Sequence, residues 1–241
     1  MDDTKNIITI DGPSYVGKSA IARELSALLG YSCVNTGHLY RAVSLLSIES
    51  GISHDDQEAL LSVAKSIKIE FKYKNNNTRT IVNNLDLTES MHSPEIDSYC
   101  SKIAILEELR NILIIIMRDY SKRGDVIFEG RDLGTVVFPK AFWKFFVDAS
   151  LDIRAKRMKK KLSEIDPKQN LEINGLKEII LELDERDYNR KIAPLRKADD
   201  AILYDNSDSP SEYQDAIILQ YYINHYCEIK NNLSDIIRRK K

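Results

Sequence analysis

The sequence predicts an α/β fold in which a five-stranded parallel sheet is flanked by helices. Short apolar runs, typical of buried strands, alternate along the chain with longer segments whose apolar residues recur at helical spacing. One segment, 67–87, instead shows the two-residue alternation of antiparallel strands. Parallel strands need helical crossovers, so we expect helices on both faces of the sheet and a small antiparallel β insert beside it.

The first strand, 7–10, leads into the loop 12–19, which has the pattern G-x-x-x-x-G-K-S. Between a strand and a helix this pattern is typical of a phosphate-binding P-loop, because backbone N–H groups and the N-terminus of the next helix point at the anion. Lys18 can reach the β- and γ-phosphates of a nucleotide, and the Ser19 hydroxyl is placed to ligate Mg²⁺. A chance glycine turn is the alternative, and the flanking strand and helix disfavour it.

The composition argues against several other classes of protein. The chain has 241 residues, enough for one large domain, and its 35 Lys and Arg residues against 37 Asp and Glu residues disfavour bulk attraction to nucleic acid or an anionic membrane. The longest apolar run, 112–117, is far shorter than a membrane span. Residues 1–4 are acidic, unlike a secretion signal, so we expect a cytoplasmic protein. Three scattered cysteines predict neither a disulfide framework nor a zinc site.

The elements after the loop follow in order. The helix that begins in the loop is expected to end at Gly30, and residues 31–34 form the second strand. A helical pattern then covers 38–49. The next helix covers 53–66, with Ser53 as its N-cap.

The antiparallel insert comes next, with strands at 67–73 and 80–87 joined by a polar turn. Ser93 is followed by proline, a strong helix start, and the helical pattern then continues without a break to about Tyr120. Ser101 and Arg110 are the notable polar residues of this segment, and taken alone they are expected on the exposed side of so long a helix.

Three further strands complete the predicted sheet, at 125–129, 143–147 and 201–204, with helical sequence between them. Ligands of parallel sheets bind at the carboxyl ends of the strands. The polar residues at those ends are Asn35, Thr36, Arg131, Asp132 and Asp148.

Two helical segments in the second half carry conspicuous charges. Residues 152–162 are densely basic, which fits either a solvated helix face or a segment that closes over a triphosphate. In the helix expected over 171–190, Asp184, Asp187 and Arg190 share one face. Taken alone, that row is equally typical of surface salt bridges.

Together these motifs resemble the bacterial cytidylate (CMP) kinases of the nucleoside monophosphate kinase group. The resemblance rests on residues 10–19, 36–41, 129–139 and 186–199, and thus extends over nearly the whole chain. Its most specific part is G-R-D-x-G-T-V-V-F-P within 129–139.

The resemblance implies ATP-dependent phosphorylation of CMP and dCMP to the diphosphates, by direct transfer with Mg²⁺. It implies a single kinase domain over 1–241, with a core of 1–62, 111–151 and 191–230, a monophosphate-binding insert at 63–110 and a helical lid region at 152–190. ATP and CMP or dCMP are the expected partners, without nucleic acid or membrane, and a monomer is expected.

The implied site residues fall into four groups. Phosphoryl transfer needs several cations to converge on the phosphates, and the catalytic residues are Lys18, Arg131, Arg154 and Arg157. ATP is bound by Gly12, Pro13, Ser14, Tyr15, Val16, Gly17, Lys18, Ser19 and Ala20. CMP is bound by Thr36, Tyr40, Arg41, Ser101, Arg110, Arg131, Asp132, Asp187 and Arg190. Ser19 is the metal ligand, Asp132 reads the base with Ser101, Arg110 and Arg190, and Asp187 binds the sugar hydroxyls.

Four positions depart from the family pattern. Tyr15 replaces a glycine, Asn35 an aspartate, His38 a small residue and Leu183 an arginine. We therefore expect a weaker or more selective enzyme. Two alternatives stay open: a kinase of another monophosphate such as UMP, and a catalytically weakened nucleotide-binding regulatory protein.

Overall fold

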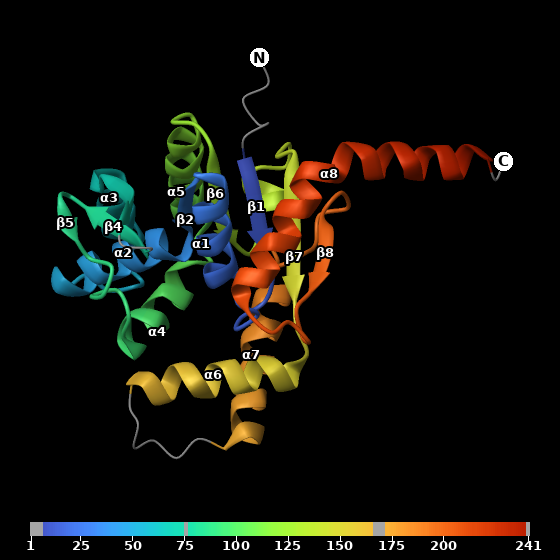
Figure 1. Ribbon diagram of the computed structural model, residues 1–241. Helices are drawn as coiled ribbons and strands as arrows, with labels where there is room; N and C mark the ends of the chain where they lie inside the picture. Colours follow the sequence, from blue (N-terminus) through green and yellow to red (C-terminus); the bar gives the residue numbers. More distant parts are fainter. Residues whose placement is uncertain (1–6, 75–76, 166–171, 240–241) are drawn as a thin grey trace.

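The computed structural model describes residues 7–74, 77–165 and 172–239 (Figure 1). Within these residues the main sheet has five strands in the order β2-β6-β1-β7-β8, and every neighbouring pair is parallel. The strands are β1 (Ile7–Asp11), β2 (Ser32–Asn35), β6 (Val126–Gly130), β7 (Trp143–Asp148) and β8 (Ile202–Asp205). The predicted parallel sheet is confirmed.

Both faces of this sheet are buried, because successive side chains of a strand point to opposite faces. Ile7 of β1 joins a core cluster with helices α2 (Gly37–Glu49), α3 (Gln57–Ser66) and α5 (Glu107–Ser121). The next residue, Ile8, joins a second cluster with α1 (Lys18–Leu29) and α8 (Glu212–Arg239). Helices therefore cover both faces, as expected for parallel strands.

A small antiparallel sheet forms the predicted insert, but the strand expected over 80–87 is two strands, because Asn83 and Asn84 adopt left-handed backbone and turn the chain. Its strands are β3 (Ile69–Lys74), β4 (Asn77–Val82) and β5 (Leu85–Asp86), paired in that order. The insert lies beside α2, α3 and α4 (Pro94–Ile103), away from β8 (Figure 1).

Two helix predictions need correction. The helix expected from Ser93 to Tyr120 is two helices, α4 and α5, separated at residues 104–106. Ser93 is the N-cap of α4, as predicted, and its hydroxyl accepts a hydrogen bond from Ile96 N at 3.2 Å. The break has a tertiary cause, because α4 packs on α2 while α5 packs on α3 and must follow a different direction.

The second correction concerns α3, which begins at Gln57 and not near Ser53. Its N-cap is Asp56, whose carboxylate accepts a hydrogen bond from Ala59 N at 3.0 Å. Serine and aspartate cap helices about equally well, so local sequence does not choose between them.

The region predicted to be a lid contains two helices, α6 (Leu151–Ile165) and α7 (Ile173–Asn189), which pack on each other at the carboxyl edge of the main sheet (Figure 1). Residues 166–171 of the predicted lid lie outside the described residues. A short π-helix, η1 (Leu133–Val137), follows β6.

In the parts of the chain that the structure describes, we find no helix with the length and hydropathy of a membrane span. The expected monomer and cytoplasmic location stay predictions.

Candidate active site

The P-loop joins β1 to α1 at the carboxyl edge of the sheet, as predicted. Gly12 has a φ of 149°, and a Cβ there would lie only 2.0 Å from the backbone oxygen of Val147 in β7. Gly17 precedes α1 with a φ of 93°. Glycine permits the close approach at the first position and the left-handed backbone at the second.

Lys18 is buried beneath this loop. Its Nζ donates a hydrogen bond to Pro13 O at 2.6 Å. Burial, and next the positive charge of Arg131, lower the pKa of Lys18 to about 7. The negative charge of a bound anion would offset both effects, so the loop is electrostatically suited to phosphate.

Ser19 meets a carboxylate on the neighbouring strand. Its Oγ donates to Glu129 Oε1 at 2.7 Å, and Glu129 is buried at the end of β6. In the described residues, no group of three or more His, Cys, Asp and Glu side chains could hold a metal. A hydroxyl and one carboxylate nevertheless suit Mg²⁺, which takes its other ligands from phosphates and water. Glu129 was missed as a site residue, although a carboxylate at a strand end was a usable signal.

Asp11, at the end of β1, joins the P-loop to the segment after β6. It accepts hydrogen bonds from Leu133 N at 3.0 Å and Gly134 N at 2.7 Å. Burial raises the pKa of Asp11 to about 6, although these two hydrogen bonds oppose the shift. The Gly-Arg-Asp turn is thereby held beside the P-loop.

Arg131 lies between the P-loop and the lid. Its Nε donates to Asp187 Oδ2 at 2.8 Å, and its Nη2 donates to Ser14 Oγ at 2.9 Å. The structure thus brings together residues predicted to bind ATP, to bind CMP and to catalyse transfer.

The two lid arginines also reach the P-loop backbone. Arg154 Nε donates to Ser14 O at 2.8 Å, and the other two nitrogens of its guanidinium bind Asp184 at 2.6 Å each. Arg157 Nη1 donates to Val16 O at 3.0 Å. The basic run is therefore more than a solvated helix face, since these two side chains point into the site.

Asn206, just after β8, supports Arg157. Its Oδ1 accepts a hydrogen bond from Arg157 Nη1 at 3.0 Å, and its Nδ2 donates to Val16 O at 2.8 Å. Asn206 is fully buried and was missed by the sequence reasoning, because only the parallel packing of β8 brings it to the loop.

Asp132 is the centre of a buried charged cluster. Arg110 Nη2 donates to Asp132 Oδ2, and Arg190 Nη2 lies 3.3 Å from Asp132 Oδ1. The guanidinium of Arg110 lies 5.7 Å from the centre of the Tyr40 ring. Four residues predicted to bind CMP, on four different segments, therefore meet here. The expectation that Arg110 lies on an exposed helix face is wrong, because its pair with Asp132 holds it buried.

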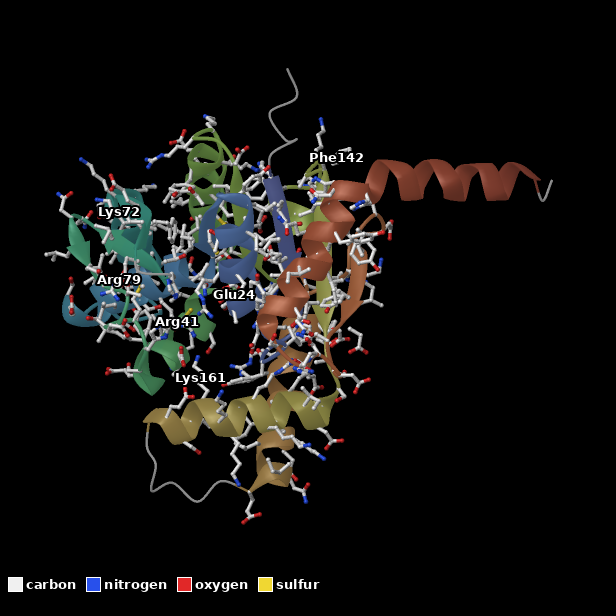
Figure 2. All side chains as sticks on the ribbon, viewed as in Figure 1. Glu24, Arg41, Lys72, Arg79, Phe142 and Lys161 are labelled. Atoms are coloured by element: carbon white, nitrogen blue, oxygen red, sulfur yellow. The ribbon has the colours of Figure 1, made fainter. Side chains whose placement is uncertain are left out.

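The remaining predicted CMP residues lie around this cluster. Arg41 donates to Asp97 Oδ1 from Nε at 3.0 Å and from Nη2 at 2.7 Å, and Lys161 of α6 lies below it in Figure 2. Thr36 Oγ1 donates to Glu129 O at 2.9 Å. Ser101 donates to Ser98 O within α4 at 2.9 Å, and no described contact joins it to Asp132.

The cytidylate kinase family model matches residues 8–222 of the chain. The chain belongs to the cytidylate kinase family. A cytidylate kinase of Clostridium botulinum is 41% identical over 204 residues, which cover 83% of this chain and 90% of that protein. A bifunctional pantoate ligase/cytidylate kinase of Prochlorococcus marinus is 40% identical over 217 residues, covering 89% of this chain and 42% of that protein. The solved shikimate kinase of Acinetobacter baumannii is 12% identical, with a TM-score of 0.44 over 92% of this chain and 96% of that one.

Membership of the cytidylate kinase family makes this chain a kinase and does not favour the regulatory alternative.

The structure places the four residues that depart from the family pattern. Asn35 ends β2, and Leu183 is half-buried on α7. His38 is buried, with Nδ1 2.7 Å from Thr80 Oγ1 of the insert, and burial lowers the pKa of its imidazole to about 3. Tyr15 has a left-handed backbone, with a φ of 61°.

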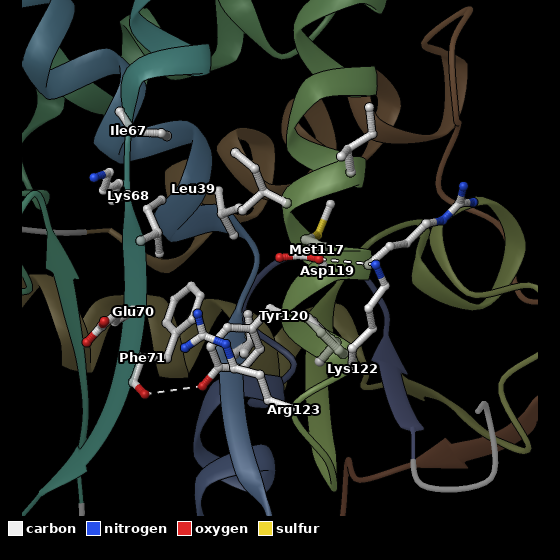
Figure 3. A pocket seen from close by; sticks show the side chains of 16 residues that line it. Leu39, Ile67, Lys68, Glu70, Phe71, Met117, Asp119, Tyr120, Lys122 and Arg123 are labelled. Carbon is white, nitrogen blue, oxygen red and sulfur yellow. Dashed lines mark hydrogen bonds and ion pairs between the residues drawn. The ribbon is translucent and has the colours of Figure 1, made fainter.

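A cavity of about 620 Å³ lies elsewhere, between β3 and α5 (Figure 3). Phe71, Met117 and Tyr120 line it, and the Tyr120 hydroxyl donates to Phe71 O at 3.2 Å. None of its lining residues is a predicted site residue of this kinase.

Proposed function

We propose that this chain transfers the γ-phosphoryl group of ATP to CMP or dCMP, giving CDP or dCDP. The observation that carries the proposal is the convergence of Lys18, Arg131 and Arg154 on the P-loop, next to the buried Asp132 cluster. The first set of charges suits a triphosphate, and the second suits a polar base. The family membership described above supports the same reaction.

The donor half is residues 12–20. Their backbone N–H groups and the N-terminus of α1 bind the phosphates of ATP, with Lys18 on the β- and γ-phosphates. Lys18 then exchanges its hydrogen bond with Pro13 O for phosphate oxygens. Its charge becomes paired, which favours the protonated form.

Ser19 and Glu129 would hold Mg²⁺, the first through its hydroxyl oxygen and the second through its carboxylate. Their 2.7 Å contact puts two hard oxygen atoms at the base of the phosphate loop. Bound there, Mg²⁺ supplies positive charge against the negative charge of the β- and γ-phosphates.

The acceptor half binds the monophosphate. Arg41 and Arg131 hold its phosphate, since a guanidinium can bind two oxygens at once. Asp132 accepts a hydrogen bond from the exocyclic amine of cytosine, with Arg110 and Arg190 as donors to the ring acceptors. Uracil would put a carbonyl opposite the Asp132 carboxylate.

The other predicted CMP residues complete this half. Thr36 and Tyr40 complete the CMP site, Ser101 joins Asp132 in base reading, and Asp187 binds the sugar hydroxyls. The insert at 63–110 and the lid at 152–190 act as the acceptor-binding and closing parts of the single kinase domain.

Transfer is direct and in line, from the donor phosphate to the acceptor phosphate. Arg154 and Arg157 stabilise the negative charge on the transferred group, and Arg131 holds the acceptor oxygen close to it. No side-chain nucleophile is required, because the acceptor phosphate is itself the nucleophile.

A panel of monophosphates tests this proposal. ADP release is measured by a coupled assay with ATP, Mg²⁺ and CMP, dCMP, UMP, AMP or GMP in turn. We expect kcat/KM for CMP and dCMP to exceed that for UMP by at least about tenfold, because Asp132 disfavours a carbonyl. Equal or higher activity with UMP would overturn the base assignment, and ADP release without any acceptor would overturn the transfer reaction.

A further inference from the structure

Tyr15 stands in the middle of the P-loop with a left-handed backbone, at a φ of 61°. Glycine adopts this conformation without strain, whereas a residue with a Cβ is disfavoured there. An aromatic residue is thus held in a conformation that the loop alone would give to glycine. Some tertiary contact must favour the ring.

The contact is the lid. The Tyr15 ring packs against an apolar cluster between α6 and α7, built from buried side chains. The buried members are Ala155, Met158, Leu176 and Ile180. Ala155 and Met158 are the direct chain neighbours of Arg154 and Arg157 on α6.

The residues on either side of Tyr15 also bind the lid. Ser14 O accepts a hydrogen bond from Arg154, and Val16 O accepts one from Arg157. Three successive loop residues therefore contact the lid, since Ser14 and Val16 bind α6 and Tyr15 between them packs on the cluster of α6 and α7. Among these contacts between the P-loop and the lid, that of the Tyr15 ring is stabilised by the removal of apolar surface from water.

We propose that Tyr15 is a positioning residue that docks the lid on the P-loop and so holds Arg154 and Arg157 at the transfer site. The ring buries apolar surface against α6 and α7 when these helices lie against the loop, which favours the docked lid before substrates bind. Two long side chains are then ordered in advance, and the transfer step does not have to order them. The role in turnover rests on the proposed function of these two arginines.

Hydrogen exchange of the α6 amides in the substrate-free protein tests the docking itself. We expect Tyr15→Gly, which suits the left-handed backbone, to accelerate exchange in residues 151–165 by about tenfold, since the open lid becomes more populated. Tyr15→Phe keeps the ring and should leave this exchange as in the parent protein. Unchanged exchange in Tyr15→Gly would overturn the proposal, and so would equal acceleration in Tyr15→Phe. The measurement needs no kinase activity.

Steady-state kinetics test the consequence for catalysis. We expect Tyr15→Gly to lower kcat about five- to twentyfold, with the KM for CMP within about twofold, because the arginines act on the transferred group. Tyr15→Phe keeps the ring, so its kcat should fall much less than that of Tyr15→Gly. A loss confined to the KM for CMP, or an unchanged kcat, would contradict the positioning role.

The lid partner gives an independent variant. Met158→Ala should reproduce the Tyr15→Gly effects in part, and the double variant should lose less than the product of the two single losses, because both substitutions weaken the same apolar cluster. Tyr213→Ala is the control, since Tyr213 is an exposed tyrosine of α8 and should change neither readout. If the losses of the two single variants multiply fully in the double variant, Tyr15 and Met158 do not act through the same cluster, and the proposal is overturned. If no monophosphate is a substrate, the proposed function fails while the exchange experiment still decides the docking.

Discussion

Two parts of the site hold their positive charges in different ways: the donor loop, residues 12–20, and the acceptor cluster, Asp132 with Arg110 and Arg190. In the donor loop, Lys18 and Arg157 donate to the backbone oxygens of Pro13 and Val16. In the acceptor cluster, the buried Arg110 faces the carboxylate of Asp132. Arg131 stands between the two, bound to a carboxylate on one side and a P-loop hydroxyl on the other.

This difference separates the two halves energetically. A neutral carbonyl can be exchanged for a phosphate oxygen with no charge left unpaired. A buried carboxylate that loses its arginine keeps an unpaired charge in a poorly solvated place, which is strongly destabilising. We therefore expect substitution of Lys18 to reduce turnover, and substitution of the buried Arg110 to reduce stability as well.

The most severe loss of stability is expected from Arg110→Ala. The free energy of unfolding should fall by about 3 to 5 kcal/mol, because Asp132 keeps only the more distant Arg190. Urea unfolding followed by circular dichroism measures the change. Asp97→Ala is the matched control, since 57% of the Asp97 side chain is exposed and its pair with Arg41 should contribute less than about 1 kcal/mol. Equal losses in the two variants would contradict the comparison.

Lys18→Ala should have the opposite profile. We expect kcat for CDP formation to fall roughly a thousandfold, because one buried cation is removed from the transferred phosphate. The thermal midpoint should not fall, because burial and the charge of Arg131 outweigh the favourable charges of Glu129 and Asp11 and lower the pKa of Lys18, so that its positive charge disfavours the folded state. The coupled assay and a thermal melt test both parts. A melt as low as that of Arg110→Ala would remove the distinction between the halves.

Asp132→Asn tests base reading with a smaller expected effect. Asparagine is nearly the same size, but it can offer an N–H to the uracil carbonyl, so the preference for CMP over UMP should narrow about ten- to a hundredfold. The ratio of the two kcat/KM values is the measurement. Asp200→Asn, at an exposed partner of Lys144, serves as the control and should leave the ratio unchanged. An unchanged ratio in Asp132→Asn would remove this residue from base reading.

The smallest expected effect is the pH dependence of ATP binding. Burial, and next Arg131, lower the pKa of Lys18 to about 7, so the free enzyme loses this charge as the pH rises above 7. The phosphates bind the protonated form, so binding takes up a proton and the Kd for ATP should rise with pH, by at most about tenfold per pH unit. Titration calorimetry in two buffers of different ionisation enthalpy measures the uptake.

Lys18→Arg is the control for this effect, because a guanidinium stays charged throughout the range. It should bind ATP without the same dependence on pH above 7. A constant Kd in the parent protein from pH 7 to 9 would show that Lys18 stays charged without nucleotide.

Contacts between distant segments explain what the sequence reasoning missed. Glu129 meets Ser19, and Asn206 meets Val16, across 110 and 190 residues of sequence. The break between α4 and α5 carries neither glycine nor proline, so no local signal marks it. Such features depend on which faces two elements present to each other, and periodicity in one segment does not contain that information.

By itself the sequence determined the five strands of the main sheet, the P-loop and the set of charged residues at the strand ends, because these follow from local patterns and backbone sterics. The tertiary structure decided which charges meet: Arg110 and Arg190 with Asp132, and Arg154 and Arg157 with the P-loop. It also decided the conformation of Tyr15, since packing against the lid holds its ring where the local backbone favours glycine. Pairing between distant segments depends on how the whole chain packs, and this packing can override the conformational preference of the local backbone.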